Sequence, residues 1–62
     1  MPIVQITIAQ GRSAEQKRAV AMQVTDVLVR ELKTPPESVT VLIYELEKDH
    51  IAKAGVLLSE KV

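Results

Sequence analysis

The chain contains no cysteine, tryptophan or phenylalanine, and it has a single histidine, His50. Without cysteine it can form neither disulfides nor thiolate-bound metal sites. Because protein zinc sites take three or four side-chain ligands, one histidine does not make a metal site. We therefore expect a protein that needs no metal, and no organic cofactor is expected either.

Aromatic side chains are limited to Tyr44, and eight basic residues are balanced by eight acidic ones. Such a chain offers no aromatic platform for stacking bases and no basic patch typical of nucleic-acid binding. No apolar run approaches the length of a membrane span, and no charged-then-apolar signal segment precedes a cleavage site. We expect neither nucleic acid nor membrane as a partner, and a cytoplasmic location.

The length allows one domain, residues 1–62. A chain this short buries only about 60% of its unfolded surface, and small domains usually depend on disulfides, a metal or oligomerisation. Only oligomerisation is open to this chain. Hydrophobic residues make up 47% of it, which is more than one small monomer can hide. The composition therefore predicts an oligomer.

Two strand-like segments flank one helical segment. Residues 2–8 are rich in β-branched side chains and alternate as a strand does. Ser13 and Gln16 fit a capping box, after which apolar residues at a 3.6-residue period predict a helix to about residue 33. Residues 38–46 form a second predicted strand with two largely apolar faces.

A strand, a helix of about twenty residues and a second strand predict an α/β fold, a single β-α-β unit with parallel strands. The predicted core stripe of the helix includes Val20, Val24, Val27 and Leu28, whereas Val29 falls off it. The short apolar segment 54–58 could form a small hairpin or add an edge strand to a neighbouring subunit.

Pro2 follows directly after Met1. Cellular aminopeptidase usually trims a methionine before so small a residue, which would leave a proline with a free secondary amine. An unperturbed α-amino group titrates near pH ~7.7–8.0, and desolvation or a nearby cation favours its neutral form. Such a group is a suitable base for proton transfer near neutral pH. If Met1 is retained, this nitrogen is an amide with no basicity.

Several short motifs occur together along nearly the whole chain. They are Pro2-Ile3-Val4, Gly11-Arg12-Ser13-x-Glu15-Gln16-Lys17, Val41-x-Ile43-x-Glu45, Lys48-Asp49-His50 and Ala54-Gly55-Val56. In combination they resemble the 4-oxalocrotonate tautomerase (2-hydroxymuconate tautomerase) family of the tautomerase superfamily.

The resemblance implies a β-α-β protomer with a short C-terminal hairpin, paired into dimers that form a hexamer. It implies removal of Met1 and a catalytic role for Pro2 as base. The expected activity is that of an isomerase, an enol–keto tautomerase. Its expected substrate is a small unsaturated 2-hydroxy or 2-oxo acid or diacid such as 2-hydroxymuconate, an intermediate of aromatic degradation.

The resemblance also implies three substrate-binding positions. Arg12 would anchor a carboxylate, since guanidinium stays charged and binds carboxylates through two parallel hydrogen bonds. Thr40 falls where the family has a second substrate arginine, and Ile51 falls where it has an aromatic wall residue. Both are departures from the family pattern. Threonine cannot neutralise a carboxylate. The loss of the charged hydrogen bond that arginine would make costs on the order of 1.5–3 kcal/mol of binding free energy.

Thr40 leaves several interpretations open. The family activity could be reduced, the substrate could be another acid, or a second chain type could supply the missing arginine in a heterohexamer instead of a homohexamer (a trimer of dimers). A second enzymatic hypothesis is that the protein is a related proline-dependent dehalogenase or decarboxylase. A non-enzymatic hypothesis is that it is a structural subunit or a degenerate binding module. His50 and Tyr44 are interpreted as structural.

Overall fold

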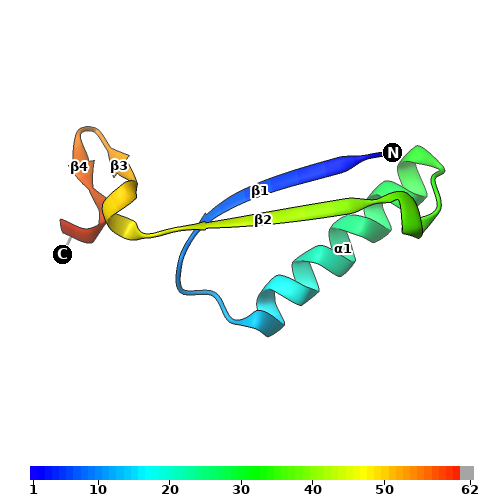
Figure 1. The fold of residues 1–62 in the computed structure, drawn as a ribbon, viewed down its shortest axis with the longest axis horizontal. Coiled ribbons are helices and arrows are strands. Elements are labelled where there is room, and N and C mark those ends of the chain that lie inside the picture. The colour runs from blue at the N-terminus through cyan, green and yellow to red at the C-terminus, as the bar shows by residue number, and fades with distance from the viewer. Residues whose placement is uncertain (61–62) are drawn as a thin grey trace.

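The computed structural model describes residues 1–60 and contains a strand–helix–strand unit followed by a small hairpin (Figure 1). In chain order the helix and strands are β1 (Ile3–Ala9), α1 (Ala14–Leu32), β2 (Thr40–Leu46), β3 (Ala52–Lys53) and β4 (Val56–Leu57). Short 3₁₀ turns lie at Pro36–Ser38, Lys48–His50 and Leu58–Glu60.

The predicted capping box at the start of α1 is confirmed. The Ser13 hydroxyl accepts from the Gln16 N–H at 3.1 Å, and the Ser13 N–H donates to Gln16 Oε1 at 3.0 Å. These bonds satisfy backbone donors that the first helical turn leaves free. The helix ends at Leu32 and is followed by the cap residue Lys33, which takes a left-handed conformation with φ of 56°. Pro35 disfavours helical geometry in the residue before it.

β1 and β2 pair in parallel, as the sequence predicts. Their register runs from Ile3 opposite Thr40 to Ala9 opposite Leu46. The helix crosses from the end of one strand to the start of the other and covers one face of the pair (Figure 1). Because side chains alternate along a strand, this face carries Ile6, Ile8 and Ile43, and the opposite face carries Ile3, Leu42, Tyr44 and Leu46.

The predicted strand boundaries need correction. β1 lies one residue later than expected. β2 begins at Thr40, not at residue 38, because Ser38 belongs to the preceding 3₁₀ turn. There the N–H and the hydroxyl of Ser38 both donate to the Pro35 carbonyl, at 3.1 Å and 2.9 Å.

The core stripe of α1 is also displaced from the predicted one. Val24 and Leu28 are half-buried as expected, and so is Val29, which the periodicity places off the stripe. Val20 and Val27 remain 43% and 45% exposed. Val20 and Val27 are seven residues apart and therefore lie on the same flank of the helix. The two-stranded sheet leaves this flank exposed.

The isolated chain does not enclose a core. None of its described hydrophobic residues is buried. Its radius of gyration is 14.8 Å, whereas a compact domain of this length would have about 11 Å. Large apolar side chains such as Ile3, Met22 and Leu32 are more than half exposed. Exposed apolar surface on this scale marks interfaces between chains, in agreement with the oligomer predicted from composition.

The C-terminal segment forms the small hairpin that was one of the two expected outcomes. β3 and β4 are antiparallel, with Ala52 opposite Leu57 and Lys53 opposite Val56. The two turn residues, Ala54 and Gly55, both have positive φ, 52° and 80°, as two-residue hairpin turns require. The hairpin projects beyond the sheet, at the end far from the N-terminus (Figure 1). Along residues 1–60, α1 is not apolar enough to serve as a bilayer-crossing helix.

Candidate active site

Pro2 and Thr40 are neighbours at one end of the sheet. The Thr40 N–H donates to the Pro2 carbonyl at 3.0 Å, which is the first hydrogen bond of the parallel pairing. Both residues are half-buried. Met1 extends from this end and is 93% exposed. Pro2, the predicted base, and Thr40, the threonine that departs from the family pattern, are therefore adjacent at this end of the chain.

Arg12 lies at the opposite end of β1. The strand has seven residues, which span roughly 23 Å at about 3.3 Å per residue. Arg12 follows in the exposed loop between β1 and α1. A single chain therefore does not bring Arg12 to Pro2, and a small acid could not touch both within one protomer.

Ile51 shares the Arg12 end of the molecule. β2 runs parallel to β1 and its last residue, Leu46, accepts a hydrogen bond from the Gln10 N–H at 2.9 Å. Ile51 follows the next 3₁₀ turn, is half-buried, and accepts from the Leu58 N–H at 2.8 Å. The four residues predicted for the site thus lie in two separate groups: Pro2 with Thr40 at one end of the strands, and Arg12 with the region of Ile51 at the other.

An ion pair holds the start of α1 against β2. Lys17 Nζ lies 2.8 Å from Glu45 Oε1, and the two side chains are 29% and 32% exposed. A pair this exposed adds little to stability. It connects the first turn of α1, which follows the loop that carries Arg12, to β2.

A surface hollow adjoins Arg12. It has a volume of about 510 Å³ and is lined by Ile8, Ala9, Gln10, Gly11, Arg12 and Lys48. We call it the Arg12 hollow. Lys48 also lines this hollow. The sequence did not mark it as a candidate site residue, although it belongs to the Lys48-Asp49-His50 motif. The sequence alone does not show that the ends of β1 and β2 are close together. Their parallel pairing brings these ends side by side.

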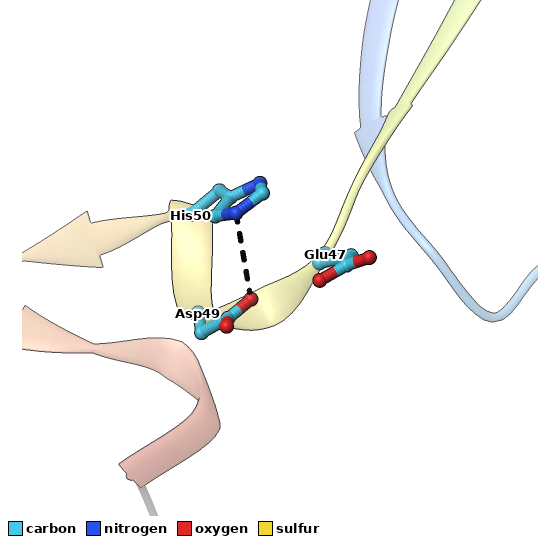
Figure 2. A group of neighbouring side chains, drawn as sticks. All are labelled: Glu47, Asp49 and His50. Carbon is cyan, nitrogen blue, oxygen red and sulfur yellow. Dashed lines mark ion pairs between the residues drawn. The ribbon is translucent and has the colours of Figure 1, made fainter.

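Three polar side chains gather at the 3₁₀ turn after β2 (Figure 2). His50 Nε2 lies 3.9 Å from Asp49 Oδ1, and one ligand atom from each of Glu47, Asp49 and His50 falls within 4.8 Å of the others. All three residues are exposed, and exposed acidic groups are common without an ion. We assign no metal to them and retain the interpretation of His50 as a loop residue.

Comparisons with known proteins match this chain over its whole length. A family model described as tautomerase enzyme matches residues 2–61. A 2-hydroxymuconate tautomerase from Pseudomonas putida is 43% identical over 60 residues, which cover 97% of this chain and 95% of that protein.

Solved structures agree. The crystal structure of a 4-oxalocrotonate tautomerase homologue superimposes with a TM-score of 0.95 at 37% identity, covering 100% of this chain and 98% of that one. A heterohexamer 4-oxalocrotonate tautomerase from Chloroflexus aurantiacus gives a TM-score of 0.90 at 28% identity, with 97% of each chain covered. The expected resemblance is confirmed: this chain belongs to the tautomerase family and is an enzyme of the 4-oxalocrotonate tautomerase type.

Proposed function

We propose that the protein is an enol–keto tautomerase of a small unsaturated 2-hydroxy or 2-oxo acid such as 2-hydroxymuconate, with the N-terminal amine of Pro2 as its base. The observation that carries the proposal is the position of Pro2. It lies at an accessible end of the sheet, hydrogen-bonded to Thr40, in a chain 43% identical to a 2-hydroxymuconate tautomerase.

The proposed reaction needs one group that accepts and returns a proton. Once Met1 is removed, the neutral secondary amine of Pro2 takes the proton of the 2-hydroxyl group. The O–H bond breaks, the 2-oxo group forms and the conjugated double bonds shift. The protonated amine then delivers the proton to a carbon of the chain, where a C–H bond forms. The amine ends neutral, and the product is the isomeric unsaturated ketone.

We propose that the enzyme is a homohexamer, a trimer of dimers, and that each site combines Pro2 of one copy with Arg12 of another. The separation of the two residues along β1 supports a shared site, since neither end of one chain holds both. The large apolar side chains that the single chain leaves exposed, such as Ile3, Met22 and Leu32, support close packing between copies.

A heterohexamer is the second candidate assembly, and Thr40 favours it. This residue brings no positive charge to Pro2, and a partner chain with an arginine there would. The similarity to a chain of the Chloroflexus aurantiacus heterohexamer adds support. In that case the present chain alone would turn over dicarboxylates slowly, and the heterohexamer formed with its partner chain would turn them over faster.

The direct test follows ketonisation of 2-hydroxymuconate by ultraviolet absorbance. The protein used should have an intact mass that is lower by one methionine residue. We expect turnover well above the buffer rate, because a neutral amine replaces water as the base. Turnover no faster than buffer would contradict the proposed substrate and direct attention to other acids or to a partner chain.

Replacing Thr40 with arginine should raise kcat/KM for this dicarboxylate by roughly ten- to a hundredfold, the value of a charged hydrogen bond. The cation would also favour the neutral form of the Pro2 amine. Thr40→Gln, long but uncharged, is the matched control and should give little gain. Equal rates for Thr40→Arg and the parent chain would mean that the site does not need charge at this position.

A further inference from the structure

Arg12 shares its hollow with a second cation, Lys48. The two residues come from different segments, the loop after β1 and the 3₁₀ turn after β2. They converge because the strands are parallel, so that both segments leave the sheet at the same end. The bond from the Gln10 N–H to the Leu46 carbonyl, 2.9 Å long, fixes these exits side by side.

Neither cation is neutralised within residues 1–60. The ion pairs of this part of the chain are Lys17–Glu45, Arg30–Glu31 and the contact between Asp49 and His50. The carboxylates next to Lys48 in sequence, Glu47 and Asp49, make no ion pair with it. Two like charges that line one hollow repel each other, and an anion between them removes that repulsion.

The lining of the Arg12 hollow suits a small organic acid. Ile8 and Ala9 contribute apolar lining, and the polar groups come from Gln10, Arg12 and Lys48. Gly11 has a φ of 125°, and no heavy atom from beyond its two chain neighbours lies within 4 Å of the point where a Cβ would stand, so the loop is open at Gly11. An apolar wall with two positive groups fits a carboxylate attached to a short hydrocarbon chain.

We propose that Lys48 is a further substrate-binding residue, which acts with Arg12 on the carboxylate of the substrate. Arginine supplies a planar fork of donors and lysine a mobile point charge. Because Thr40 is uncharged, the positive charge that binds the substrate would then come from Arg12 and Lys48, at the Arg12 end of the strands. It rests on the proposed function for the identity of the acid, although not for the binding of a carboxylate.

The test measures binding of muconate, a dicarboxylate that lacks the 2-hydroxyl group and so cannot undergo the reaction. Calorimetry at low salt should give a Kd about five- to tenfold weaker for Lys48→Ala than for the parent protein. Lys48→Arg should restore most of the affinity. The ratio of the muconate Kd of Lys48→Ala to that of the parent protein should fall towards one as salt is added, since exposed charges are screened. Arg30→Ala, on the outer side of α1, is the matched control and should bind as the parent does.

Kinetics provide the second measurement. With 2-hydroxymuconate, Lys48→Ala should raise KM by a similar factor and leave kcat within about twofold, as expected for uniform binding. An unchanged muconate Kd in Lys48→Ala, or no muconate binding by the parent protein, would overturn the inference. Lys48-dependent muconate binding in a protein that turns over no 2-hydroxymuconate would support the inference and contradict the proposed substrate.

Discussion

Replacing Pro2 with alanine is expected to remove most of the activity, with a loss in kcat of up to the roughly 10²- to 10⁴-fold contribution of a general base. Alanine also allows Met1 to be trimmed, so the variant still has a free amine at this position. It lacks the ring that fixes the proline nitrogen relative to its backbone. The loss therefore measures how far catalysis depends on the ring-held secondary amine, and full activity in this variant would rule out a requirement for proline at this position.

A second variant separates the amine from the ring. Inserting a lysine between Met1 and Pro2 should keep Met1 in place, because aminopeptidase trims methionine before small residues. Pro2 is then intact, but its nitrogen is part of an amide and has no basicity. With this variant, ketonisation of 2-hydroxymuconate should be no faster than in buffer alone. Intact mass confirms the retained methionine, and size-exclusion chromatography checks that the assembly is unchanged. Activity near that of the trimmed enzyme would mean that another group is the base.

Replacing Arg12 with alanine should lower kcat/KM for a dicarboxylate by about ten- to a hundredfold, mainly through KM. The guanidinium lies in an exposed loop and makes no ion pair within residues 1–60, so little stability should be lost. Steady-state kinetics with 2-hydroxymuconate measures the effect, and Arg12→Lys shows how much of it a point charge recovers. Unchanged KM and kcat would count against the carboxylate role.

Co-expression of the Pro2→Ala and Arg12→Ala chains tests whether the site is shared. If Pro2 and Arg12 of one site come from different copies, random mixing restores both residues in roughly one site in four. The mixed protein should then exceed either parent variant by a wide margin. No recovery in a mixed oligomer would place both residues of a site in one chain. A stable monomer near 6.8 kDa would contradict every version of the assembly.

Local features of this protein were well predicted by its sequence. The capping box at Ser13 and Gln16 depends on two side chains three residues apart, and both of its hydrogen bonds are present. Proline and glycine mark the breaks between elements because their backbone preferences act within one or two residues. The extent of α1 and the existence of two strands followed from such signals. The start of β2 did not, because Ser38 can serve equally well in a strand or in a turn.

The functional residues divide in the same way. Pro2, Arg12, Thr40 and Ile51 were identified from the sequence motifs and the resemblance, and their roles remain proposals. Lys48 was overlooked, because its relation to Arg12 depends on two strands that are distant in sequence and meet only through their parallel pairing. Val29 was misplaced for a related reason: a periodic pattern does not reveal which side of a helix rests on a two-stranded sheet.

By itself, the sequence determined the helix, the two long strands and their order, which depend on local hydrogen bonding. It also predicts partner chains, a prediction that depends on the amount of apolar surface. The tertiary structure decided which residues meet. The parallel register of β1 and β2 places Thr40 against Pro2 and brings Lys48 to Arg12. The length of β1 keeps these two pairs apart, because an extended strand is a rigid spacer of about 3.3 Å per residue.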